Sequence, residues 1–149
     1  MAQRPDISLT PEEQAAFLRE HRKAALATID KDGFPHLVAM SFAVEDGAFY
    51  MTSYGKAQKV VNLRRNPKAA LMVEGGESYA ELRGIMVRGE CEIIAGPEAV
   101  EHVFALLAKA RGETAPRPGP LASAPKRVVL KLVPHKITSW DHSKLGGRY

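Results

Sequence analysis

Two hydroxyl residues and two lysines surround a glycine turn near the middle of the chain. Thr52 and Ser53 close an apolar, strand-like run, Gly55 follows, and Lys56 and Lys59 open a short basic segment that a proline ends. Hydroxyls, the backbone N–H groups of a helix start and ammonium groups can together bind a phosphate. The segment therefore predicts a phosphate site, although a solvated basic helix capped by a hydroxyl residue remains the alternative. It is not a Walker loop, because the Gly-x-x-x-x-Gly-Lys spacing is absent.

No other familiar catalytic or metal-binding motif is present. The five histidines lack the spacing of a zinc-binding helix, and Cys91 is the only cysteine, so an internal disulfide is excluded. The Gly-x-Ser-x-Gly turn of serine hydrolases is also missing. We therefore expect no metal site, and the sequence identifies no catalytic side chain. Cys91 lies in a strand-like run and is expected to be a small buried hydrophobe.

Two further clusters combine an aromatic residue with charged neighbours. One contains Tyr79 and Arg83, and the other contains Trp140 and His142. An aromatic side chain can stack on a conjugated ring, and an arginine can hold a carboxylate or a phosphate. The alternative is structural: Trp140 anchors the tail by packing, and Arg83 is a surface charge.

The composition is that of one globular domain spanning residues 1–149. The 149 residues are 45% apolar and 26% charged, with a formal net charge of +4. No run approaches the roughly 18 apolar residues of a membrane span, and the N-terminus lacks an apolar signal-peptide core. The basic cluster has no interleaved aromatic residues, so a nucleic-acid partner is not expected. A lone cysteine fits a reducing compartment, and we expect a cytoplasmic protein.

The order of helix and strand signals predicts a mainly β (α+β) fold. A capping box at Thr10-Pro11-Glu12-Glu13 opens a helix within residues 1–22, and a proline-rich loop covers 113–125. Strands joined by short turns favour an antiparallel sheet, and about six of them close into a small barrel. The expected strands are 23–29, 34–44, 48–53, 68–74, 79–94 and 127–133, with a short basic helix before Pro67, a helix at 96–111 and a polar tail at 136–149.

Residues 34–44 alternate strictly, so the two faces of this strand meet different surroundings. The bulkier face, expected in the core, carries Val38, Met40, Phe42 and Val44. The smaller face, expected to leave room for something flat or for another subunit, carries Leu37, Ala39, Ser41 and Ala43. Later in the chain, Gly84 and Gly89 predict sharp bends or bulges.

Residues 10–147 resemble the split-barrel flavin and deazaflavin oxidoreductases related to pyridoxamine 5′-phosphate oxidase. The most specific matches are Lys59-Val60-Val61-Asn62-Leu63-Arg64-Arg65-Asn66-Pro67 and the tail segment from Ser139 to Gly147. The resemblance implies a six-stranded antiparallel Greek-key split barrel with flanking helices. It also implies a homodimer with two cofactor sites at the interface between the subunits.

The same resemblance implies where the cofactor binds. Its phosphate would contact Thr52, Ser53 and Lys59, with Lys56 nearby. Its ring would lie along the second strand, at Leu37, Val38, Ala39, Met40 and Ser41. The partner subunit would contribute residues around Tyr79 and Arg83.

The sequence departs from the pyridoxamine-phosphate oxidases themselves. Ala57-Gln58-Lys59 stands where those enzymes have Ser-Arg-Lys, and residues 37–42 lack their arginine and lysine, so oxidation of vitamin B6 is not expected. The Asn-Leu-Arg-Arg-Asn-Pro and Trp-Asp-His signatures are more similar to the branch that uses coenzyme F420, the deazaflavin of actinobacteria. The polyglutamate tail of F420 would be attracted by Lys56, Lys59, Arg64, Arg65 and Lys68.

The resemblance therefore implies an F420-dependent oxidoreductase that transfers hydride from reduced deazaflavin to a small conjugated organic substrate. Because the cofactor carries such chemistry, no essential side-chain nucleophile is expected, and the candidates for a proton donor are an ordered water, Tyr79 and His142. An FMN-dependent oxidase or reductase of the same fold is one alternative. A non-catalytic protein that binds or stores F420, flavin or haem is another.

Overall fold

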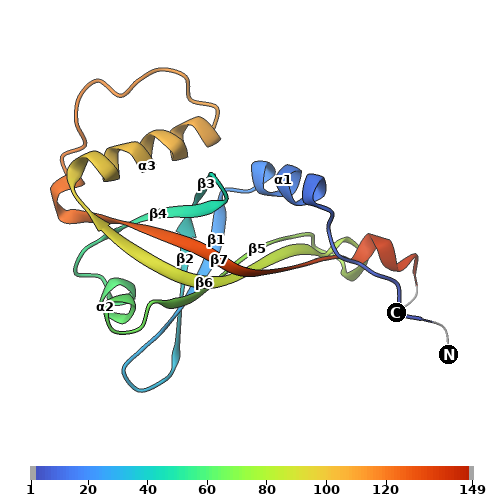
Figure 1. Cartoon of the computed structure of the whole chain (residues 1–149). Helices are drawn as coiled ribbons and strands as arrows, with labels where there is room; N and C mark the ends of the chain where they lie inside the picture. The colour runs from blue at the N-terminus through green and yellow to red at the C-terminus, as the bar shows by residue number, and fades with distance from the viewer. Residues whose placement is uncertain (1–2, 148–149) are drawn as a thin grey trace.

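One antiparallel sheet organises the chain, and the computed structural model describes residues 3–147 of it (Figure 1). The sheet has seven strands in the order β2-β1-β5-β6-β7-β4-β3. The strands are β1 (Lys23–Ile29), β2 (Pro35–Ser41), β3 (Ala43–Glu45), β4 (Ala48–Tyr54), β5 (Lys68–Gly75), β6 (Arg83–Ala95) and β7 (Arg127–Asp141). The helices are α1 (Pro11–Glu20), α2 (Gln58–Arg65) and α3 (Pro97–Ala110), with short 3-10 turns η1 (Tyr79–Glu81), η2 (Ala124–Lys126) and η3 (His142–Leu145).

A kink at Phe42 explains why the sheet has seven strands rather than the predicted six. The expected strand 34–44 is divided at this residue into β2 and β3, which lie at opposite edges of the sheet. The chain therefore passes from one edge to the other within a few residues, and the sheet curls into the predicted split barrel. The backbone N–H of Phe42 donates to the carbonyl of Arg22 at 3.2 Å, which ties the kink to the residue before β1.

The kink also resets the alternation of buried and exposed side chains. From Leu37 to Phe42 the predicted pattern is confirmed, because Val38, Met40 and Phe42 pack against the core. Beyond the kink it is wrong: Ala43 is buried and Val44 is 42% exposed. Since Phe42 and Ala43 are both buried, the two-residue period cannot continue through them.

Two apolar clusters stabilise the fold. The larger fills the interior of the curled sheet. Its residues come from helices and strands and include Phe17, Leu26, Phe49, Met51, Leu71, Ile85, Val87, Leu130 and Leu132. The smaller lies between α3 and the sheet, and Val100, Val103 and Leu107 of α3 pack there against Ala43 and Val129. Spacing of three and four residues places these side chains on one face of α3, so the predicted helix is confirmed.

The long strands β6 and β7 differ from expectation at their ends. Residues 79–81 form a 3-10 turn rather than strand, and β7 continues past the predicted end at Val133 to Asp141. The register between the two strands shifts between Arg88 and Gly89, so the predicted irregularity at Gly89 is a β-bulge.

The pairing of β6 with β7 continues through Gly84 without a register shift, contrary to the predicted bend or bulge there. It pairs with Trp140 across the sheet, and a Cβ atom at Gly84 would overlap the indole ring. The glycine is therefore needed to leave space for that ring.

The remaining local predictions are met at α1 and Cys91. Thr10 and Glu13 form the predicted capping box at the start of α1. Cys91 is buried, and burial raises the pKa of its thiol to about 12, so it stays protonated at neutral pH.

Among residues 3–147, no helix is long and apolar enough to cross a membrane. Within the same residues, no group of three or more His, Cys, Asp and Glu side chains could hold a metal ion.

Candidate functional site

A buried polar chain fixes α2 against the barrel. Asn62 and Thr28 are both 0% exposed, and Asn62 Nδ2 donates to Thr28 Oγ1 at 3.0 Å. Gln58 Nε2 donates to Asn62 Oδ1 at 2.7 Å, so both ends of the buried amide are hydrogen-bonded. Val60 and Leu63 on the same helix are buried in the barrel core. The sequence motif around Asn62 is thus partly structural: it decides how α2 sits on β1.

The N-terminus of α2 has no side-chain cap. Its N-cap residue is Ala57, and no acidic residue lies in the first turn, whereas α1 has Thr10 and Glu13 in these roles. The first N–H groups of a helix lack partners within it and carry partial positive charge. The start of α2 can therefore accept an anion from outside the chain.

A cluster of cations without carboxylate partners lies beside this helix start. Burial and the positive charge of Arg127 lower the pKa of Lys59. The guanidinium of Arg127 lies 4.2 Å from the centre of the Tyr54 ring, and its Nε donates to Ser123 Oγ at 3.1 Å. Within residues 3–147, none of Lys56, Lys59 and Arg127 forms an ion pair. An anion placed here would relieve the repulsion between Lys59 and Arg127.

Thr52 and Ser53, predicted to act together, point to opposite faces of β4. Ser53 is 3% exposed and its hydroxyl donates to the carbonyl of Tyr54 at 3.1 Å. Thr52 pairs with Val129 and Tyr54 pairs with Arg127, so these four side chains share the other face. The structure thus brings Thr52 to the face that carries Arg127, and Ser53 to the barrel interior.

The outer face of β2 is open to solvent. Leu37 is 69% exposed, Ala39 and Ser41 are also exposed, and Val38 and Met40 point inward. A hollow of about 620 Å³ lies beside this face of β2. It is lined by Leu37, Val38, Ala39, Ala25, Met72, Glu74 and residues 20–24.

Tyr79 and Arg83 lie at the other end of the molecule from α2. The Tyr79 and His142 rings are 4.5 Å apart, and His142 Nδ1 donates to the Tyr79 carbonyl at 2.7 Å. Arg83 Nη2 lies 3.8 Å from Glu20 Oε2, and the Arg83 guanidinium lies over the Phe17 ring. Figure 1 shows α2 on the left and η3, which begins at His142, on the right. A single chain therefore does not bring Tyr79 and Arg83 to the cations of α2.

Four residues with functional potential were missed by sequence reasoning. Arg127 joins Lys59 through the pairing of β4 with β7, and Arg88, His135 and Lys136 line a second hollow on the outer sheet. No local pattern marks them, because the pairing of distant strands brings them to these places.

Comparison with known proteins agrees with the fold. The profile described as pyridoxamine 5′-phosphate oxidase matches residues 10–141. A solved structure of the conserved hypothetical protein Rv2991 from Mycobacterium tuberculosis is 36% identical, with a TM-score of 0.84 over 100% of this chain and 95% of that one. A protein described as F420 reductase is 28% identical, with a TM-score of 0.68 over 86% of this chain and 98% of that one.

More distant structures share the fold alone. The haem storage protein HutZ from Vibrio cholerae is 16% identical, with a TM-score of 0.66 over 88% of this chain and 96% of that one. The comparison with curated proteins finds no significant match. The match over residues 10–141 and the identity with the mycobacterial protein establish the relationship: the chain belongs to the pyridoxamine 5′-phosphate oxidase family of split barrels.

Proposed function

We propose that this chain is an oxidoreductase that binds the deazaflavin coenzyme F420 and reduces a small conjugated substrate. The observation that carries the proposal is the pair Lys59 and Arg127, two close cations without a carboxylate partner among residues 3–147, at the uncapped start of α2. The likeness to an F420 reductase at 28% identity supports the choice of cofactor.

The residues at the start of α2 fit the phosphate of such a cofactor. Lys59 and Arg127 supply charge, Thr52 a hydroxyl, and the first turn of α2 its N–H groups. Lys56 is exposed next to them and adds to the field. When bound, reduced F420 supplies the hydride, while the protein contributes position and electrostatics.

The outer face of β2 fits a flat ring. Leu37, Ala39 and Ser41 present small or apolar groups there, and no element of the described part of the chain covers them. On the opposite face of β2, Val38 and Met40 pack against the core and hold the strand in place. In this role the β2 face orients the ring and excludes water from one side of it.

A second copy of the chain completes the proposed site. The exposed side chains Leu37 and Met72 make the outer sheet face apolar over β2 and β5, and such faces are normally covered. In the proposed twofold arrangement, Tyr79 and Arg83 of the second copy contribute to the site of the first, as the family resemblance implies. The proposed assembly is therefore a homodimer, which we place in the cytoplasm because the single buried cysteine has no disulfide role.

In this proposal His142 of the second copy, which lies beside Tyr79, delivers the proton. Its Nδ1–H donates to the Tyr79 carbonyl, so Nε2 is the nitrogen that takes up a proton from solvent and passes it to the substrate. His142→Gln should then lower turnover and leave the affinity for F420 unchanged. Equal turnover in the two proteins would exclude His142 and leave Tyr79 and an ordered water as the candidates for the donor.

A turnover assay tests the function. Purified protein is mixed with reduced F420 and a panel of quinones, enones and conjugated acids, and the reappearance of oxidised F420 is followed. Reduction of at least one acceptor, lost in Lys59→Ala and kept in Lys31→Ala, is expected. Tight F420 binding without any turnover would instead assign a storage role, and turnover with bound FMN alone would assign a flavin enzyme.

A further inference from the structure

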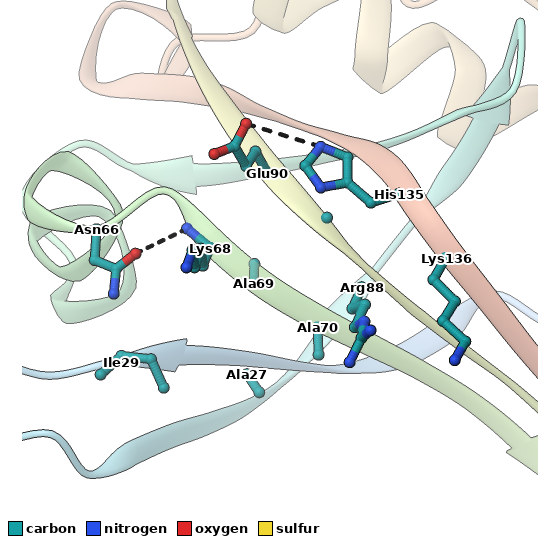
Figure 2. Close-up of a pocket in the computed structure, with 11 residues that line it drawn as sticks. Ala27, Ile29, Asn66, Lys68, Ala69, Ala70, Arg88, Glu90, His135 and Lys136 are labelled. Atoms are coloured by element: carbon teal, nitrogen blue, oxygen red, sulfur yellow. Dashed lines mark hydrogen bonds and ion pairs between the residues drawn. The ribbon is translucent and has the colours of Figure 1, made fainter.

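An open hollow of about 710 Å³ lies on the outer face of the sheet, away from the start of α2 (Figure 2). Its volume is within the usual range for small-ligand sites, about 300–1,000 Å³. Small side chains form its floor, at Ala27 and Ala70. Three cations from three neighbouring strands, Lys68, Arg88 and Lys136, stand around that floor.

Strand register places the floor and the cations in one line. Leu37 pairs with Ala27, Ala27 with Ala70, Ala70 with Arg88, and Arg88 with Lys136. Directly paired residues point to the same face of a sheet. The row is therefore apolar over β2, β1 and β5 and cationic over β6 and β7.

A β-bulge adds a histidine to the cationic end. Arg88 pairs with Lys136 and Gly89 with Pro134, so His135 has no partner on β6. A Cβ atom at Gly89 would overlap the carbonyl oxygen of Val133, so the close approach of the strands at the bulge needs glycine. Bulges of this kind re-aim a side chain, and His135 Nε2 lies 3.8 Å from Glu90 Oε2.

The charges of the hollow do not balance. Among residues 3–147, Glu90 is the only acidic residue that lines it, and its partner is His135. In the part of the chain from 3 to 147, Lys68, Arg88 and Lys136 form no ion pair. Three like charges gathered over an apolar floor attract a ligand that is itself part apolar and part anionic.

We infer that this hollow binds a flat ligand with two or more carboxylates, its conjugated part on Ala27 and Ala70 and its carboxylates at Arg88, Lys136 and Lys68. The residues described above support the hollow as a binding site. Its assignment to the substrate of the reductase rests on the proposed function. Carboxylates could also arrive on the glutamate tail of the cofactor. Both sources share the oligocarboxylate chemistry, and a rigid and a flexible probe separate them.

Calorimetric titration with three probes tests the inference. Benzenetricarboxylate is planar and anionic, its triamide is planar and neutral, and tri-γ-glutamate is anionic and flexible. The wild-type protein should bind the tricarboxylate at least about tenfold more tightly than the triamide, as expected when charged hydrogen bonds contribute. Preference for tri-γ-glutamate over the planar acid would support the oligocarboxylate site and assign it to the cofactor tail.

Paired variants supply the controls. The double variant Arg88→Gln/Lys136→Gln should bind the tricarboxylate about tenfold more weakly, and Lys31→Gln, in the β1–β2 hairpin, should bind it as the wild type does. The altered side chains are exposed, and circular dichroism verifies that the variants fold. Equal affinity for acid and amide, unchanged affinity in the double variant, or no binding because a second copy closes the hollow would overturn the inference.

The two proposals can fail separately. Lys59→Ala should leave the tricarboxylate affinity unchanged, because Lys59 lies outside this hollow. If F420 fails to bind the wild type while the tricarboxylate binds, the cofactor proposal fails and the oligocarboxylate site stands. If F420 binds and no oligocarboxylate does, the reverse holds.

Discussion

Asn62 donates a hydrogen bond to Thr28 across 3.0 Å, and both side chains are completely buried. This contact joins α2 to β1 through two residues that lie 34 positions apart in the chain. Since Lys59 lies one turn earlier on the same helix, the contact sets the position of the lysine as well. A buried polar pair thus fixes the helix that carries Lys59 of the candidate phosphate site.

Replacing one partner of this pair should destabilise the protein. In Asn62→Leu the hydroxyl of Thr28 is left buried without its donor, at a cost of about 1–3 kcal/mol in the free energy of unfolding. Replacing both, as in Thr28→Val/Asn62→Leu, should cost less than the sum of the two single changes. Urea denaturation of the four proteins measures the coupling; strict additivity would show that the contact contributes nothing.

The pKa of Lys59 predicts how cofactor affinity depends on pH. Burial first, and then the charge of Arg127, lower this pKa. Without ligand, the unfolded chain holds the proton to higher pH than the folded protein does, so stability rises with pH between the two pKa values. Binding of a phosphate needs the charged lysine, so affinity should fall as pH rises through the lowered pKa.

The variant Lys59→Arg separates this effect from a general loss of affinity at alkaline pH. Arginine stays charged across the accessible pH range, so in the variant the fall in affinity should move to higher pH. Dissociation constants for F420, measured by fluorescence quenching over a pH series, make the comparison. The same pH profile in both proteins would remove Lys59 from the phosphate site.

Gly84 and Trp140 predict a steric effect on the tail. Gly84→Ala places a methyl group inside the volume of the indole ring, and overpacking of this kind costs typically about 1–3 kcal/mol. We expect a lower midpoint of denaturation and a shift in Trp140 fluorescence, since it is the single tryptophan of the chain. Gly112→Ala, with no heavy atom within 4 Å of the new carbon, serves as a spatial control, although its φ of +80° adds a backbone cost. An unchanged Trp140 emission in Gly84→Ala would contradict the packing account.

Much of the fold could be predicted because its signals are local. The capping box at Thr10, the apolar spacing of α3 and the alternation in β2 each lie within one element. The kink at Phe42 was missed because alternation of side chains along a strand does not reveal where the strand changes edges. The end of β7 was missed because Pro134 and charged neighbours disguise a strand that long-range pairing with β6 maintains.

The candidate site divides in the same way. Lys59 and Thr52 could be found from hydroxyl, glycine and lysine spacing, but the opposite orientations of Thr52 and Ser53 follow from their adjacent places in β4. Arg127, Arg88 and Lys136 could not be found, because only strand register brings them beside their neighbours. The sequence marks Asn62 only as part of the family motif, and its burial reveals its structural role.

The most direct test of the account is an equilibrium titration of the purified protein with F420 and, separately, with FMN. We predict that F420 binds and its fluorescence is quenched, and that Lys59→Ala weakens this binding by about 1.5–3 kcal/mol, as for a lost charged hydrogen bond. Lys31→Ala should bind F420 as the wild type does. Failure of the wild type to bind either cofactor at micromolar concentration, or unchanged affinity in Lys59→Ala, would contradict the account.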